Sequence, residues 1–241
     1  MHRGCIKIYS IFENVKVAKT SINSFKSAAE VILVAVTKQV DISKTEEVIL
    51  AGIKDIGENR VEPAKAKIDM LRAKYPSVSW HFIGHLQRKK VKQVVELFDL
   101  IHSVDREELI EKIIKEASEQ NKKQRILLQV NIAKEEQKQG FEADEIENIV
   151  KLYQNNEYII IDGLMMMAPL IDSKETAPYF RELKKLHESL ITKGYKIGQV
   201  LSMGMSNDYI EAVKAGSTMV RLGTVLFNPL PKGEGGREAA G

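Results

Sequence analysis

Eight short apolar runs recur along the chain, each separated from the next by a longer stretch with the spacing of an amphipathic helix. Several runs, such as residues 31–36, are almost continuously apolar, which is typical of parallel strands that are covered on both faces. The intervening stretches are long enough to cross back over a parallel sheet. Eight such units in succession predict a closed α/β barrel. The predicted strands are residues 31–37, 55–58, 78–83, 100–104, 125–132, 159–166, 199–203 and 219–223.

Helical spacing also predicts how the chain is organised around the barrel. The predicted helices are residues 44–54, 61–75, 89–98, 106–120, 142–154, 174–193 and 208–215. We expect residues 1–30 to form a helical segment, with a helix over about 6–29 that packs on the barrel floor, and residues 31–228 to form the barrel. Residues 229–241 are rich in proline and glycine, which predicts a flexible tail.

Composition excludes several broad classes of protein. A length of 241 residues suits one barrel domain, and a net charge of +3 does not favour binding to a phosphate backbone. The single cysteine, Cys5, forms no internal disulfide and favours a reducing cytoplasm. No apolar stretch is long enough to span a bilayer, and the N-terminal residues lack the pattern of a secretory signal. We therefore expect a cytoplasmic protein.

Polar residues that follow a strand are the first candidates for a site, because barrel enzymes and binding proteins build their sites at the carboxyl ends of the strands. Lys38 directly follows the first predicted strand. Partial desolvation there would favour a neutral, nucleophilic amine, which suits an imine with a carbonyl compound. A lysine that extends from the barrel rim into solvent is the alternative.

A second group of candidates follows the last two strands, where barrels of this type bind phosphate. Ser206 precedes an apparent helix start, so its hydroxyl and the first backbone amides suit an anion, although serine is also an ordinary N-cap. Gly223 and Thr224 stand at the end of the last strand. Strand alternation places Arg221 on the same face as Gly223, where its guanidinium either contacts a ligand or forms a structural ion pair.

The histidines show no spacing typical of metal ligands, and we predict no metal site. Met203 and its neighbour Met205 are interpreted as core or pocket wall, because methionine fills irregular gaps.

Blocks of sequence from residue 31 to 228 resemble the YggS/PROSC family of pyridoxal phosphate homeostasis proteins. The matching blocks stand in the family's order and include VILVAVTK at 31–38, GEN at 57–59, WHFIGHLQRKK at 80–90, QVNI at 129–132, KQG at 138–140, GLM at 163–165, LSMGMS at 201–206 and GSTMVRLGT at 216–224. The resemblance implies a single (β/α)8 TIM barrel similar to the N-terminal domain of alanine racemase.

The same resemblance implies pyridoxal 5′-phosphate (PLP) as the cofactor, held as a covalent aldimine on Lys38. It further implies that Ser206, Gly223 and Thr224 hold the phosphate, that Arg221 faces the pyridine nitrogen and that Asn59 lines the ring pocket. Lys138, Met203 and His81 are secondary candidates for contacts with the cofactor.

An arginine at the pyridine nitrogen disfavours protonation of that nitrogen and weakens the ring as an electron sink. The chain ends soon after the eighth strand, where alanine racemases continue into a β-domain that supplies a second base. We therefore expect a protein that stores, buffers or delivers PLP without robust turnover, as a monomer or weak dimer, with PLP-dependent apo-enzymes as possible recipients.

Two other classes of function compete with this hypothesis. A PLP-dependent amino-acid racemase or lyase would need a base such as Tyr209 near the site. A nucleic-acid-binding module would use the basic runs at 88–90 and 122–123, but no aromatic residues accompany them as a stacking platform.

Overall fold

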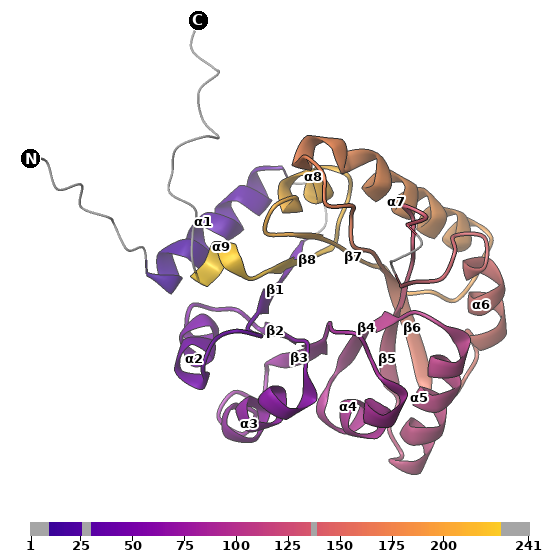
Figure 1. Ribbon diagram of the computed structural model, residues 1–241, viewed down its shortest axis with the longest axis horizontal. Helices are drawn as coiled ribbons and strands as arrows, with labels where there is room; N and C mark the ends of the chain where they lie inside the picture. Colours follow the sequence, from indigo (N-terminus) through magenta and orange to yellow (C-terminus); the bar gives the residue numbers. More distant parts are fainter. Residues whose placement is uncertain (1–9, 26–29, 136–138, 228–241) are drawn as a thin grey trace, which may run out of the picture.

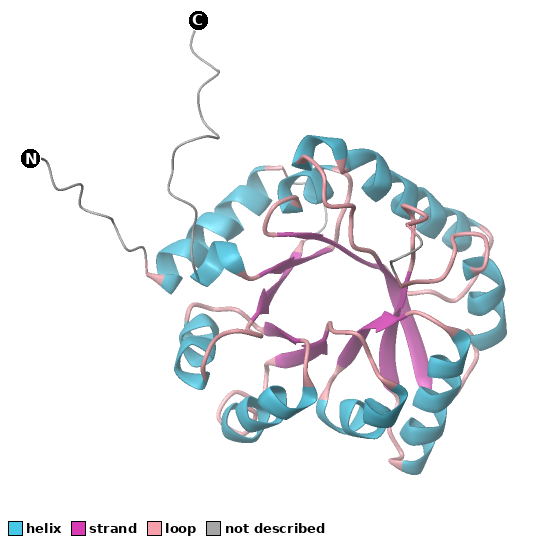
Figure 2. Ribbon diagram, viewed as in Figure 1, coloured by secondary structure: helices cyan, strands magenta, loops and turns pink. Residues whose placement is uncertain are grey.

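A closed barrel of eight parallel strands forms the centre of the computed structural model, which describes residues 10–25, 30–135 and 139–227. Each strand pairs with its neighbours in chain order, and β1 pairs with β8 to close the ring. Figures 1 and 2 show the helices arranged around the outside of this ring. The barrel fold predicted from the eight apolar runs is confirmed.

The strands lie close to their predicted positions. Their bounds are β1 Ile32–Val36, β2 Asp55–Glu58, β3 Ser79–Phe82, β4 Leu100–Val104, β5 Gln124–Gln129, β6 Ile159–Met165, β7 Val200–Met205 and β8 Met219–Leu222. The largest difference is at the end of β5, which the apolar pattern extends to residue 132. Beyond Gln129 the Val130 amide still donates to the Met165 carbonyl of β6, and Val130 forms an isolated bridge with Phe141 in place of a longer strand.

Helices or short 3-10 turns connect the strands. Their bounds are α1 Ile11–Ser24, α2 Ile42–Leu50, α3 Val61–Leu71, η1 Arg88–Lys90, α4 Val91–Leu97, α5 Glu107–Glu119, α6 Ile146–Tyr153, η2 Ser173–Glu175, α7 Ala177–Thr192, α8 Tyr209–Lys214 and α9 Thr224–Phe227. The α9 helix was not predicted, because its few residues follow directly on the last strand.

The N-terminal helix α1 is shorter than the predicted 6–29, of which residues 6–9 and 26–29 lie outside the described residues. It begins where Ser10 and Glu13 form a capping box, each side chain bonding the other's backbone amide. Its buried residue Asn14 donates a hydrogen bond to the Leu226 carbonyl in α9 at 2.9 Å. This hydrogen bond joins the segment before the first strand to α9, the helix that follows the last strand. The predicted tail at 229–241 lies outside the described residues.

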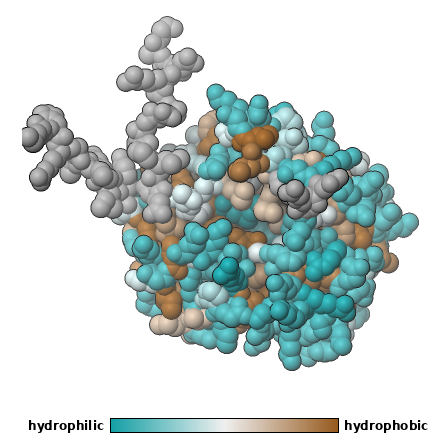
Figure 3. All heavy atoms as spheres, viewed as in Figure 1, coloured by the Kyte–Doolittle hydropathy of each residue, from teal (hydrophilic) through white to brown (hydrophobic). Residues whose placement is uncertain are grey.

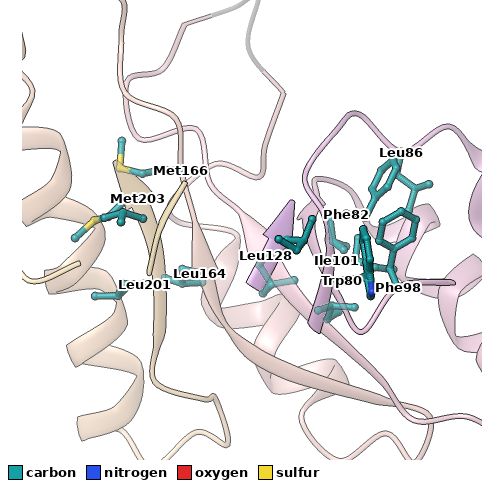
Figure 4. Close-up of a cluster of buried hydrophobic side chains, with 14 of the residues drawn as sticks. Trp80, Phe82, Leu86, Phe98, Ile101, Leu128, Leu164, Met166, Leu201 and Met203 are labelled. Carbon is teal, nitrogen blue, oxygen red and sulfur yellow. The ribbon is translucent and has the colours of Figure 1, made fainter. Parts of the chain in front are cut away.

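Two apolar clusters stabilise the barrel. The larger one fills the space between the strands and the surrounding helices, and Figure 4 shows part of it, including Trp80, Phe82 and Phe98. A smaller cluster joins strands that are not neighbours, so it must lie inside the barrel. Its buried members are Val34, Leu100, Leu127, Met165 and Met219. Each fully buried side chain of this size contributes roughly 1.5–3 kcal/mol to folding.

The described helices are too short and too polar for any of them to cross a membrane. On the face seen in Figure 3, the surface is mostly hydrophilic and the hydrophobic residues form small patches.

Candidate functional site

A cavity of about 630 Å³ opens at the carboxyl ends of the strands. Its size lies within the range of small-molecule sites. The structure brings together all six residues that the sequence singles out as the principal site, and these are Lys38, Asn59, Ser206, Arg221, Gly223 and Thr224. They come from the ends of β1, β2, β7 and β8, so they occupy neighbouring parts of one wall.

Lys38 lies in the turn that follows β1. The amide of Val40 donates to the Thr37 carbonyl at 3.1 Å, and this turn presents the Lys38 side chain to the cavity. The side chain is exposed, so the protein alone does not provide the partial burial that we expect from the apolar strand. It does not extend away from the barrel either, because it lines the cavity.

The residue before Lys38 is fixed by a buried ion pair. Glu58 and Lys67 are almost fully buried, and Lys67 Nζ lies 2.6 Å from Glu58 Oε1. The same ammonium donates to the Thr37 carbonyl at 2.6 Å, and the Thr37 hydroxyl donates to Glu58 Oε1 at 2.5 Å. Both ends of Thr37 are therefore held from α3 and β2, which sets the direction in which the chain enters the Lys38 turn. Sequence reasoning missed Lys67, although Glu58 stands in the matching GEN block.

Hydrogen-bond donors converge at the other end of the wall. The Ser206 hydroxyl accepts from the Gly223 amide at 3.2 Å and from the Val225 amide at 3.5 Å. One hydroxyl and two backbone amides thus gather between the ends of β7 and β8, an arrangement that suits a phosphate. Thr224 lines the cavity beside them.

Ser206 is not the N-cap of the helix that follows it. That position belongs to Asp208, since α8 begins at Tyr209. The two amides that bond the Ser206 hydroxyl belong to Gly223, which joins β8 to α9, and to Val225 in α9. The expectation that amides of α8 meet an anion stays a prediction.

Asn59 follows β2 and lines the cavity. Gly84, at the end of the neighbouring strand, approaches it so closely that a β-carbon on Gly84 would lie 2.2 Å from the Asn59 carbonyl oxygen. A side chain at residue 84 would force this part of the wall apart.

Arg221 points into the barrel and lines the cavity from below. Its guanidinium donates to the Ser202 carbonyl at 2.8 Å, to the Ser202 hydroxyl at 2.6 Å and to the Met166 carbonyl at 3.0 Å. Burial lowers the pKa of Arg221 to about 10, an effect that the charge of Asp208 opposes. The residue still carries its charge at neutral pH. Within the described residues no carboxylate forms an ion pair with it, so the structural ion pair considered as an alternative is not observed.

Two of the three secondary candidates, Met203 and His81, are not among the described residues that line the cavity. Met203 is fully buried in the larger apolar cluster, and Figure 4 shows it beside Leu201. The register between β7 and β8 shifts between Ser202 and Met205, at Gly204, which has a φ of +95°. After this irregularity Met205, not Met203, lines the cavity.

His81 is buried inside the barrel, where it contacts His102 and Asp55 and does not line the cavity. Lys138 lies outside the described residues.

Sequence reasoning also missed Asp208, which lines the cavity. Its carboxylate accepts a hydrogen bond from the Met205 amide at 2.6 Å, and burial raises its pKa. Asp208 stands two residues after the matching block that ends at Ser206, and no spacing in the sequence marks it as part of the wall.

The model of the family described as "Alanine racemase, N-terminal domain" matches residues 6–231. The chain is also 41% identical over 196 residues to the pyridoxal phosphate homeostasis protein of Synechocystis sp., covering 81% of this chain and 89% of that protein. The chain belongs to the pyridoxal phosphate homeostasis protein family.

Other members of this family cover the chain almost completely. The pyridoxal phosphate homeostasis protein of Aquifex aeolicus is 34% identical over 226 residues, covering 93% of this chain and 97% of that protein. A solved structure of PipY from Synechococcus elongatus with PLP bound is 31% identical, with a TM-score of 0.81, and the match covers 91% of this chain and all of PipY.

More distant structures share the barrel alone. An alanine racemase of Clostridium difficile is 14% identical, with a TM-score of 0.72. The match covers 91% of this chain and 57% of the racemase. This likeness supports the fold and no particular activity.

Proposed function

We propose that this protein binds PLP at the cavity and contributes to PLP homeostasis by storing, buffering or delivering the cofactor. The observation that supports this best is the arrangement of the wall: the Lys38 amine at the end of β1, the donors around Ser206 between β7 and β8, and the Arg221 guanidinium beneath. These groups match the aldehyde, the phosphate and the pyridine nitrogen of PLP in chemical type. The PLP bound to PipY and the shared family name of the relatives support the same assignment.

Lys38 holds the cofactor covalently in this proposal. PLP, when bound, would supply an aldehyde that the Lys38 amine can hold as an imine with loss of water. Lys38 would be released either when water hydrolyses the imine or when another primary amine takes its place. Since Lys38 is exposed within an open cavity, the structure leaves room for this exchange.

PLP supplies an electron sink when it is bound, and the protein environment sets the strength of that sink. Arg221 stays charged at neutral pH and is held by three hydrogen bonds. If it faces the pyridine nitrogen, its charge keeps that nitrogen unprotonated and opposes carbanion chemistry. Tyr209, which a racemase or lyase would need as a base, does not line the cavity. Both points favour a binding protein over an enzyme with robust turnover.

Absorbance titration of the full chain with PLP tests the binding site. Wild-type protein should develop an imine band that borohydride abolishes, and Lys38→Ala should not. Lys44→Ala is the matched control, because Lys44 lines the same cavity on α2 and should leave the band intact. A band that survives in Lys38→Ala and disappears in Lys44→Ala would overturn the assignment of Lys38.

The same preparations test for turnover. PLP-loaded wild-type protein should racemise alanine and serine no faster than Lys38→Ala. Robust racemisation that requires Lys38 would show that the protein is an enzyme of this cofactor class.

A further inference from the structure

Five polar side chains form a continuous hydrogen-bonded network through the inside of the barrel. His81 Nε2 lies 3.0 Å from Asp55 Oδ1, and His81 Nδ1 lies 2.9 Å from His102 Nε2. His102 Nδ1 lies 3.0 Å from Ser202 Oγ, which accepts from Arg221 at 2.6 Å. The network joins β2, β3, β4, β7 and β8, so it crosses the interior between strands that are not neighbours.

This network connects the two ends of the barrel. Arg221 lines the large cavity at the carboxyl ends of the strands. Asp55 begins β2 at the opposite end, where it lines a hollow of about 260 Å³ that α1 and the barrel floor share. The Asp55 side chain is 24% exposed, whereas the four other residues of the network are buried.

A barrel interior is ordinarily filled by branched apolar side chains, so a buried polar chain there needs a reason. A buried polar group without a partner costs about 1–3 kcal/mol. Among the described residues, some buried polar atoms have no hydrogen-bond partner, but none of them belongs to this network. The network is therefore complete, and a complete network holds its members in one arrangement.

With both imidazoles neutral, the Asp55 carboxylate fixes the direction of the hydrogen bonds between Asp55 and Ser202. A guanidinium only donates, and an ionised carboxylate only accepts. Ser202 Oγ accepts from Arg221 through one lone pair, and its own hydrogen is available for donation to His102 Nδ1. His102 then has its hydrogen on Nε2 and donates it to His81 Nδ1, and His81 donates from Nε2 to Asp55.

We propose that Asp55, His81, His102 and Ser202 form a directed hydrogen-bond relay that positions the Arg221 guanidinium at the cavity, with both imidazoles neutral and protonated on Nε2. Ser202 and His102 are thus positioning residues that act on a cavity ligand through Arg221. Among the described residues the guanidinium donates to the Ser202 hydroxyl, which belongs to the relay, and to the backbone carbonyls of Ser202 and Met166. The relay thus supplies the side-chain partner of Arg221.

The surroundings of His102 agree with a neutral ring. Burial lowers the pKa of His102 well below its ordinary value, and His81, Arg221 and Arg125 lower it further. These groups face it from β3, β8 and β5.

Nitrogen-15 NMR of the histidines tests the relay in the full chain without any cofactor. His81 and His102 should both appear as neutral rings with hydrogen on Nε2, and His102 should remain so between about pH 5 and pH 8. A ring with hydrogen on Nδ1, or a His102 that becomes protonated in this range, would overturn the proposal. This measurement needs no variant, so it does not depend on whether a variant folds.

Ser202→Ala tests the positioning role. Losing the hydroxyl removes the donor to His102 Nδ1, so the Nδ1 resonance of His102 and the Nε resonance of Arg221 should both shift. Ser217→Ala is the matched control, because Ser217 is also a buried serine, next to β8, and bonds only the backbone carbonyls of Leu201, Met203 and Met219. Shifts no larger in Ser202→Ala than in Ser217→Ala would contradict the relay. Ser202→Thr, which retains a hydroxyl, should restore the wild-type resonances.

The effect on PLP rests on the proposed function, and its failure can be told apart from failure of the relay. In PLP-loaded protein, the absorption maximum of the imine should shift in Ser202→Ala and stay in place in Ser217→Ala. No imine band in wild type would refute the proposed function and leave the NMR result on the relay standing. A normal band that Ser202→Ala does not shift would refute the action of the relay on the cofactor.

Discussion

Lys67 and Glu58 form a buried ion pair 2.6 Å apart, directly against the residue that precedes Lys38. The pair links α3 to the end of β2 and also binds both the carbonyl and the hydroxyl of Thr37. The position of the Lys38 amine therefore depends on two charges that never reach the cavity.

Replacing Lys67 alone should destabilise the protein strongly. Lys67→Met leaves the Glu58 carboxylate buried and unpaired, and breaking a buried pair in this way costs about 3–5 kcal/mol. Adding Glu58→Gln removes the unpaired charge and should recover part of that loss. Denaturant unfolding measures both. The control is Lys65→Met on the same helix, where the pair with Asp69 is exposed and the cost should stay below about 1 kcal/mol. Equal losses for Lys65→Met and Lys67→Met would contradict this description of the pair.

The donors around Ser206 should matter only for ligands that have a phosphate. Ser206→Ala removes a hydroxyl that two amides help to orient, and hydrogen bonds to charged groups contribute about 1.5–3 kcal/mol. We expect PLP affinity to fall by roughly ten- to a hundredfold, since about 1.4 kcal/mol corresponds to tenfold. Fluorescence or absorbance titration measures the change. Pyridoxal, which lacks the phosphate, should bind wild type and variant alike, and an equal loss for both ligands would refute a phosphate site at Ser206.

His102 should make the protein less stable in mild acid. Burial keeps the folded-state pKa of His102 well below 6.5, whereas in the unfolded chain the ring takes up a proton below 6.5. The unfolded state then binds more protons, so this contribution to stability is complete above pH 6.5 and is lost as pH falls from there toward the folded-state pKa. The slope for one proton is at most about 1.4 kcal/mol per pH unit.

Urea unfolding of wild type and His102→Gln between pH 5 and pH 8 isolates this contribution. The free energy of unfolding should fall more steeply in wild type than in the variant on the acid side. Parallel curves would mean that His102 takes up its proton in the folded state too.

The strands and the principal wall of the cavity are predictable from the sequence because both depend on local pattern. A buried parallel strand is nearly continuous in apolar residues, and its end is marked by the first polar residue, as at Lys38 and Asn59. Arg221 and Gly223 follow from strand alternation in the same way. Met203 lies in the core and Met205 on the cavity wall, the two environments expected for this pair. Which methionine takes which place depends on the irregularity near Gly204, and a single glycine does not reveal this in the sequence.

Contacts between distant strands cannot be predicted from local sequence pattern. The pairing of His102 with Ser202 spans 100 positions along the chain, and each residue alone has an ordinary interpretation as buried packing or a strand serine. Lys67 appears in the sequence as one more polar residue of an amphipathic helix. Its burial follows from how α3 packs against β2, which no spacing pattern specifies.

The assignment of Lys38 is tested most directly by mapping the bond it is proposed to form. The full chain is loaded with PLP, reduced with borohydride and digested, and the modified peptide is located by mass spectrometry. The PLP-derived mass should be found on Lys38. Its presence on Lys44 or Lys138 with Lys38 unmodified, or its absence from every lysine after incubation with a large excess of PLP, would contradict the account.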